Sequence, residues 1–402
     1  MSRLFSQPRF GTPQFVAGAL LLFFVAECVW LIAHNRPSAM TPDDFDRVEQ
    51  GLDQWQGRKI AGLNISGSSS QEWLSPSLAA SEREHSPLWY LAESAPLALF
   101  HVRPESVEGM WLVRIPYLLT GVLLGASLWY VSRRLYGNAG GYIALVLYCF
   151  SPTVIRASAL WFAAPILPGA WGGFGAVFTA ISVAHTLYAP REVVLWNWRR
   201  ILLLGISLAL AVGWHFALVL FVPLLLGFMF YLAPNRRSAA TVILLVASGI
   251  ALLILLAAYG FHPASFWYGV RSAWPWTLSR RALTMGGAYR LVFKELADSA
   301  PVLLVLAPGA LVTYIFWPRT RYFGNTAPLI VVVIFLALRA ASPHEPQSVF
   351  ALIGLVFLLV FVAGIAADLL ETPAREVCLA VFSSLLAANA IWNLVGLARI
   401  GP

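Results

Sequence analysis

Charged residues are scarce in this sequence. Of its 402 residues, 11% are charged, whereas soluble domains carry about 25%. Hydrophobic residues make up 59%, and the mean hydropathy is +0.73. The composition therefore excludes a soluble globular domain and predicts an all-α protein that crosses a membrane many times.

Cysteine is also rare. Cys28, Cys149 and Cys378 each lie inside an apolar segment, and no two of them have the CxxC spacing of a metal or redox site. We therefore predict neither a disulfide framework nor a metal site, and interpret all three as small buried side chains. The net charge of +8 comes from short basic clusters between apolar runs. This pattern favours the surface of an anionic bilayer and does not indicate nucleic-acid binding.

Long apolar runs predict about eleven membrane-spanning helices in a single domain that covers residues 1–402, because one span needs about 20 residues. The first run, 15–33, contains Glu27 and Trp30 and lacks a small-residue cleavage site, so we interpret it as an uncleaved span rather than a signal peptide. The other runs are 111–131, 141–160, 165–188, 201–215, 217–232, 240–260, 301–317, 327–341, 348–367 and 376–397. The two runs beside Trp214 are alternatively one broken span.

Arginine clusters between the spans predict the orientation, since short basic loops stay in the cytoplasm. With the N-terminus in the cytoplasm, the clusters at Arg133, Arg199, Arg236, Arg319 and Arg375 all fall on the cytoplasmic side. The opposite face then holds two long loops, 34–110 and 261–300. The second of these is basic although it is external, and we expect it to bind an anion.

The loop 34–110 opens with the segment Thr41-Pro-Asp-Asp-Phe-Asp46. Apolar residues with helical spacing follow up to position 55, and Pro42 suits a first helical turn. Asp43 and Asp44 are either caps of this helix, where free N–H groups favour a carboxylate, or a general base at the membrane face. A second helix is predicted over 87–100, with Trp89 and Tyr90 at the level of the lipid headgroups.

Five short motifs occur in a fixed order along the first half of the chain. They are Asp43-Asp44, His85-Ser-Pro-Leu-Trp-Tyr90, Arg114-Ile-Pro116, Arg133-Arg-Leu-Tyr-Gly137 and Ser151-Pro152. In this order they resemble the GT-C superfamily of polytopic glycosyltransferases. In particular, they resemble the bacterial branch that is similar to protein O-mannosyltransferases and to lipid A aminoarabinose transferase. The resemblance covers residues 15–190, with Asp44 in place of the usual Glu and Ser86 in place of a Pro.

The resemblance implies a GT-C-like bundle in the cell inner membrane that transfers a hexose or pentose on the periplasmic face. A carboxylate, Asp44 or Asp43, would deprotonate a glycan, lipid or protein acceptor, and the donor would be a polyprenyl-phosphate-linked sugar. The leaving phosphate needs cationic stabilisation. Candidates that bind donor or acceptor are His85, Arg114, Arg156, Arg271, Arg280, Arg281 and His344. No cofactor and no metal site is predicted, although some relatives hold a divalent cation near the acidic residue.

Each candidate also has an ordinary structural interpretation. Arg114 lies near the start of a span and is expected to snorkel to the surface, and the other arginines are expected to contact lipid headgroups. Two other functions remain open. One is a transporter or flippase of lipid-linked sugar, which is disfavoured because Glu27 is the clearest charge inside the membrane. The other is a non-catalytic membrane subunit with the same fold.

Overall fold

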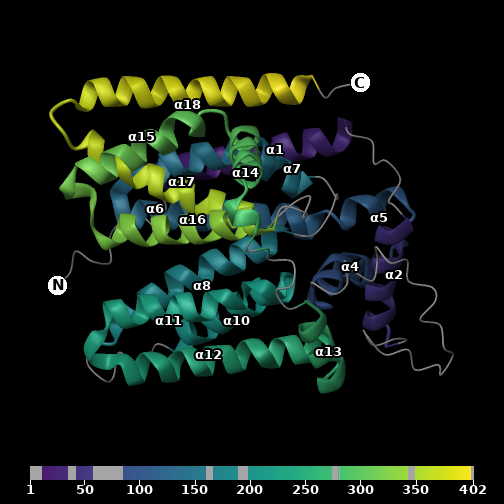
Figure 1. Ribbon diagram of the computed structural model, residues 1–402. Coiled ribbons are helices and arrows are strands. Elements are labelled where there is room, and N and C mark those ends of the chain that lie inside the picture. Colours follow the sequence, from purple (N-terminus) through teal and green to yellow (C-terminus); the bar gives the residue numbers. More distant parts are fainter. Residues whose placement is uncertain are drawn as a thin grey trace.

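The structure is a computed structural model. It describes residues 11–34, 42–57, 85–159, 166–188, 198–273, 279, 281–342 and 349–399, and for residues 42–47 it describes the backbone alone. All regular structure in these residues is helical. Long helices lie side by side along one axis, and shorter helices gather at one end (Figure 1). The prediction of an all-α polytopic membrane protein is confirmed.

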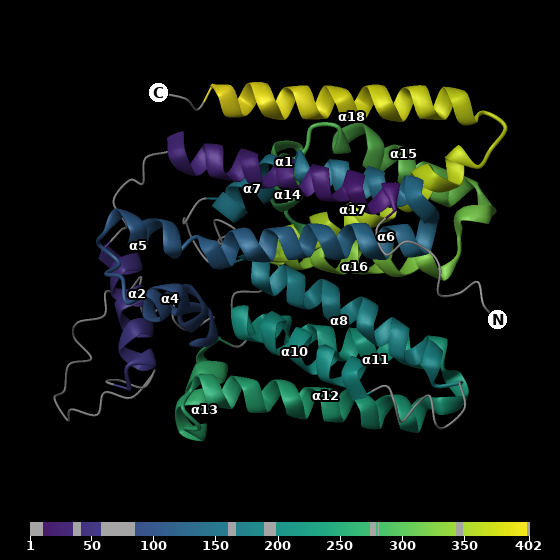
Figure 2. The ribbon, with the colours of Figure 1, turned by 180° about the vertical axis from the view of Figure 1, so that it is seen from behind.

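The first part of the bundle consists of helices that alternate in direction. They are α1 (Thr12–His34), α6 (Ile115–Cys149), α7 (Pro152–Ala159), α8 (Ile166–Thr186), α10 (Trp198–Trp214), the short η1 (Phe216–Leu220), α11 (Phe221–Leu232), η2 (Pro234–Arg236) and α12 (Arg237–Ala258). Helix α8 packs against α10 and α11, and α10 in turn packs against α12. These four helices form one side of the bundle, seen from behind in Figure 2.

The second part contains α15 (Leu303–Phe316), η4 (Pro318–Thr320), α16 (Phe323–Ala341), α17 (Val349–Leu370) and α18 (Arg375–Ala398). Helix α17 is apolar on all sides, and a helix of that kind belongs in the interior. It is accordingly buried along almost its whole length against α6, α8, α15 and α16. Helix α18 is the opposite case, since it lies on the outside of the bundle and buries only Asn389, Asn393 and Leu397.

Helix α6 is two legs joined at Gly137, whose φ of 75° lies in the left-handed region that favours glycine. The predicted turn at Arg133-Arg-Leu-Tyr-Gly137 is therefore confirmed. The adjacent Tyr136 hydroxyl donates to the carbonyl of Gly324, 2.6 Å away, and fixes this turn against the start of α16. We call this end of the bundle the turn end.

Seven described helices are long and apolar enough to cross a membrane. An eighth span results if α14 (Gly286–Ser299) and α15, which meet at 112°, are one broken span. Every predicted apolar run contains a helix, but α10, α11 and α15 are shorter than a full span. The number of eleven spans stays a prediction.

The end opposite the turn end carries α2 (Pro42–Trp55), α4 (Leu88–Phe100), α5 (Val107–Leu112) and α13 (Pro263–Ala273) (Figures 1 and 2). We call it the loop end. The two helices predicted in the loop 34–110 are confirmed as α2 and α4. The Gln54 side-chain amide of α2 donates to the carbonyl of Ala258, 2.7 Å away at the end of α12. The loops 34–110 and 261–300 therefore meet at the same end, as predicted.

Candidate functional site

Helix α2 is held tightly on α4. Val48 and Leu52 of α2 are buried in one cluster with Leu97 of α4 and with Val113, the residue before Arg114. Gly51 lies so close to α4 that a Cβ atom there would overlap the carbonyl oxygen of Tyr90 and the Ser94 hydroxyl. The Trp55 indole N–H donates to the carbonyl of Leu91, 2.9 Å away. Contacts from Val48 to Trp55 therefore fix the second half of α2 on α4.

The acidic pair lies in the first turn of α2, as predicted. The helix begins at Pro42, so Asp43 and Asp44 follow directly, and Asp44 precedes the buried Val48 by one helical turn. The first turn is where backbone N–H groups favour a carboxylate. The side chains of Asp43 and Asp44 lie outside the described residues, so both the cap and the general base stay predictions.

The His-Ser-Pro motif is anchored to the end of α10. The Ser86 N–H and the Ser86 hydroxyl both donate to the carbonyl of Gly213, at 2.9 and 2.8 Å. The Nδ1 atom of His85 contacts the carbonyl oxygen of Trp214. Because a carbonyl can only accept, Nδ1 carries the proton, and Nε2 of a neutral His85 is the nitrogen that can accept a proton.

His215 faces His85 at the loop end. The two rings meet edge to face with centroids 5.6 Å apart, and the His215 ring also lies 5.5 Å from that of Phe350. His215 stands in the turn between α10 and η1, and its Nδ1 accepts from the N–H of Ala217 at 3.2 Å. Burial, with a smaller contribution from His85, lowers the pKa of His215 to about 3, so its imidazole is neutral.

Trp89 and Tyr90 are buried inside the protein and do not face lipid, while their position at the level of the headgroups stays a prediction. Their exposed fractions are 6% and 8%, and both are buried in a cluster with Trp214. The physical reason is that the apolar face of α4 packs on the end of α10 and not on lipid. His215 and Trp214 thus belong to the site, and the sequence analysis missed them. The sequence signal that could have identified them is His215, a polar residue where two apolar runs meet.

Arg114 is the most unusual residue of the loop end. It stands at the N-cap of α6, its exposed fraction is 7%, and its Nε atom is buried without a hydrogen-bond partner. No ion pair or side-chain hydrogen bond joins Arg114 to any other described residue. That its head group snorkels to the surface stays a prediction, because Nε is the guanidinium nitrogen found buried and the residue keeps an exposed fraction of 7%. A buried guanidinium without a counter-charge is costly, and the site can lower this cost by binding an anion.

The other predicted binding residues are spread over the loop end. Arg156 on α7, Arg271 on α13 and Arg281 before η3 (Ala282–Thr284) are exposed. Arg280 and His344 lie outside the described residues. Direct contacts thus bring together the motif of His85 and the end of α10. Among the described residues, no such contact holds the side chains of the three exposed arginines.

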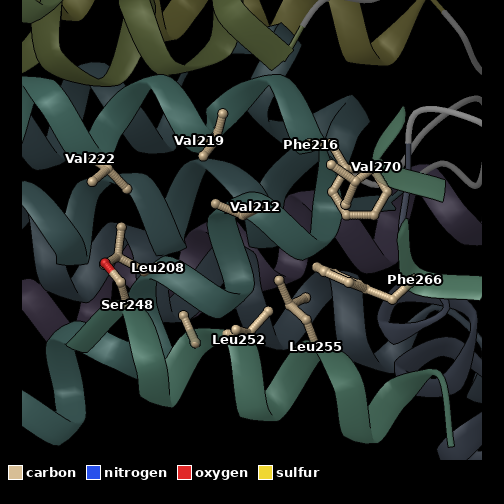
Figure 3. A pocket seen from close by; sticks show the side chains of 11 residues that line it. Leu208, Val212, Phe216, Val219, Val222, Ser248, Leu252, Leu255, Phe266 and Val270 are labelled. Atoms are coloured by element: carbon tan, nitrogen blue, oxygen red, sulfur yellow. The ribbon is translucent and has the colours of Figure 1, made fainter. Parts of the chain in front are cut away.

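An apolar groove opens between α10, η1, α11, α12 and α13 (Figure 3). Its volume is about 190 Å³, and Ser248 is the single polar residue among the described residues that line it. Phe266 and Val270 of α13 close one end, and Val270 directly precedes the exposed Arg271. The groove is thus apolar in its described lining, and it ends at the helix that carries Arg271. The other lining residues are Leu208, Val212, Phe216, Val219, Val222, Ala251, Leu252 and Leu255.

The described residues contain no group of three or more His, Cys, Asp or Glu side chains that could hold a metal ion. The side chains of Asp43, Asp44 and Asp46 are outside this set. The statement about a divalent cation near the acidic residue therefore stays a prediction.

No protein-family model and no curated protein matches the chain by sequence. Solved structures do match. The apo oligosaccharyltransferase of Archaeoglobus fulgidus has a TM-score of 0.62 at 15% identity, and the alignment covers 97% of this chain and 57% of that chain. The archaeal oligosaccharyltransferase AglB in complex with an inhibitory peptide and a dolichol-phosphate has a TM-score of 0.59 at 15% identity, over 97% and 56% of the two chains.

This chain thus spans a little over half the length of the solved structures that it matches. At 15% identity the likeness establishes the fold. Archaeal oligosaccharyltransferase is a GT-C superfamily member, so the GT-C-like fold expected from the five motifs is confirmed.

Proposed function

We propose that the chain is a membrane glycosyltransferase that moves a sugar from a polyprenyl-phosphate donor to an acceptor at the loop end. The loop end is then the periplasmic face of the inner membrane. The GT-C-like fold supports this class of reaction, and the archaeal oligosaccharyltransferase AglB, which shares the fold, has been solved in complex with a dolichol-phosphate. The transferred sugar would be a hexose or a pentose.

The observation that carries the proposal is Arg114, which is buried and has no counter-charge among the residues that the structure describes. Its neighbour Val113 is buried in the same cluster as Val48 of α2, the helix that begins with the acidic pair. A cation and a carboxylate-bearing helix thus share one end of the bundle. The donor phosphate would supply the missing anion, and the guanidinium would stabilise the negative charge that develops on the phosphate as it leaves.

The reaction that fits these residues is an inverting transfer. Asp44 or Asp43 accepts the proton of the acceptor hydroxyl, and the acceptor oxygen forms a bond to C1 of the sugar. The bond from C1 to the phosphate oxygen breaks from the opposite side, and its electrons remain on the polyprenyl phosphate. No nucleotide and no redox change is required.

The remaining candidates have supporting roles in this proposal. The apolar groove between α10 and α12 takes part of the polyprenyl chain, since its described lining is apolar apart from Ser248 (Figure 3). The exposed Arg271, on the helix that closes one end of the groove, is a second candidate contact for the phosphate. His85, which is anchored beside Trp214 at the loop end, is a candidate contact for the sugar or the acceptor.

The test is sugar transfer by the purified full-length protein in proteoliposomes that contain a radiolabelled polyprenyl-phosphate sugar. Replacing Arg114→Met should lower the transfer rate about 100-fold, because removal of one charge-stabilising group costs roughly that much. Arg236→Met, which removes an exposed cation at the start of α12, is the matched control and should keep the rate. Full activity of the R114M protein would contradict the proposal. Movement of the labelled lipid-linked sugar across the vesicle membrane, without transfer of the sugar to an acceptor, would instead establish a flippase.

A further inference from the structure

Helix α14 crosses the bundle near the loop end. It meets α15 at 112°, so the two helices are nearly perpendicular. Helices α16, α17 and α18 extend along the bundle (Figure 1). It packs against α7 and α16. We take the long axis of the bundle as the membrane normal, because the long apolar helices extend along it (Figure 1), and α14 then lies across this axis, close to the plane of the membrane.

One face of α14 is fixed to the bundle. Ala288 and Val292 are buried against Ala340 of α16. The guanidinium of the fully buried Arg339 donates through Nε to both carboxylate oxygens of Glu295, at 3.1 and 2.9 Å. The Ser151 hydroxyl donates to the carbonyl of Ser299, 2.8 Å away. This face is therefore rigid and has its polar groups paired.

The opposite face of α14 carries two aromatic and two cationic side chains in adjacent helical turns. Tyr289 and Phe293 have exposed fractions of 45% and 63%, and Arg290 and Lys294 are exposed beside them. Residues four apart are neighbours on a helix, so the aromatic pair and the cationic pair form parallel rows. The exposed Asp298 follows one turn later, and Glu295 is bound to Arg339, so the two rows keep a net positive charge.

We infer that this face of α14 binds anionic phospholipid headgroups of the outer leaflet. Exposed aromatic side chains on an in-plane helix insert at the boundary between headgroups and acyl chains, and cations beside them meet the lipid phosphates. The charge complementarity favours an anionic lipid over a zwitterionic one. It also explains why the external loop 261–300 is basic, against the usual distribution of charge. The inference is independent of the proposed enzyme activity.

The test uses a fluorophore beside this face. Gly287 is exposed, and a Cβ there would meet no atom within 4 Å, so Gly287→Cys can carry an environment-sensitive dye. Cys28 and Cys149 are buried, and Cys378→Ser removes the third thiol. The labelled full-length protein in detergent is titrated with short-chain phosphatidylglycerol and, separately, with short-chain phosphatidylcholine. Thermal unfolding of each variant checks that it is folded.

We expect saturable binding of phosphatidylglycerol and a much weaker response to phosphatidylcholine. R290Q/K294Q should weaken the binding of phosphatidylglycerol about 25-fold, since one cation near a lipid surface contributes roughly a fivefold change. The charge-keeping R290K/K294R should retain the original affinity. An unchanged affinity in R290Q/K294Q, or an equal response to both lipids, would overturn the inference. Displacement of the lipid by inorganic phosphate would do so too, since it would show a site for a free anion.

Discussion

Ser86 and Gly213 are joined by two hydrogen bonds to one carbonyl, from the N–H of Ser86 at 2.9 Å and from its hydroxyl at 2.8 Å. The residues are 127 positions apart in the sequence. The bonds fix the start of α4 to the end of α10. They also place His85 beside Trp214 and His215. This contact is therefore one of the anchors that position the loop end on the bundle.

Removing the Ser86 hydroxyl should loosen that contact. S86A is expected to lower the free energy of unfolding by about 1 kcal/mol, the usual net value of one buried hydrogen bond. The measurement is the thermal unfolding midpoint of the purified protein in detergent. T241A is a suitable control, because the exposed Thr241 hydroxyl bonds only to the carbonyl of Arg237 in its own helix, and it should show no change. Equal stability of S86A and the original protein would contradict this role.

Replacing Arg114 should not lower stability, in contrast to S86A. Its burial with no counter-charge in the described part of the chain costs stability, so R114M is expected to keep or raise the thermal unfolding midpoint while it lowers transfer. The midpoint is measured without donor lipid. A strong loss of stability in R114M would show that the guanidinium has a structural partner, and it would remove the argument for an anion site.

The pair of Arg339 and Glu295 should be structural. R339M leaves the Glu295 carboxylate, whose side chain is 26% exposed, without its partner. A fully buried pair broken in this way costs about 3–5 kcal/mol, and the partial exposure of Glu295 makes a smaller loss the expectation. The double variant R339M/E295L removes both charges and should recover most of that loss. A double-mutant cycle on the unfolding midpoints measures the coupling. If R339M/E295L is as unstable as R339M alone, the ion pair is not the cause.

The low pKa of His215 predicts a dependence of stability on pH. In the unfolded chain the imidazole binds a proton below about pH 6.5, whereas in the folded chain it does so only near pH 3. The unfolded state therefore binds more protons between these values, and stability falls as the pH drops from 6.5 toward 3. H215N can still accept the N–H of Ala217, and it should lose less stability over this range. A parallel decline in both proteins would refute this assignment.

Local features were predictable from the sequence. The start of α2 at Pro42 and the turn at Gly137 follow from the backbone preferences of proline and glycine. The helical segments follow from apolar runs, because a membrane requires backbone groups to be satisfied within each helix.

Contacts between distant segments were not predictable. Glu27 is recognisable in the sequence as a charge inside the membrane. Its partner Asn393 on α18 is 366 positions away in the sequence, and the Asn393 side-chain amide donates to the Glu27 carboxylate at 3.1 Å. Arg339 falls within an apolar run of the sequence, and its pairing with Glu295 emerges only from the packing of α14 on α16. The burial of Arg114 and Trp89 depends on how α4 packs on α10 and α2, and no periodicity in the sequence contains that information.

The central claim is that the acidic pair at the start of α2 supplies the base for sugar transfer. The most direct measurement is the single-turnover transfer rate of D43N and D44N in proteoliposomes loaded with labelled polyprenyl-phosphate sugar. We predict that one of them, with Asp44 favoured, lowers the rate by roughly 10²–10⁴-fold, as loss of a general base does. Donor binding should be retained, because Asn keeps the shape of the side chain. Unchanged transfer in both variants would contradict the account.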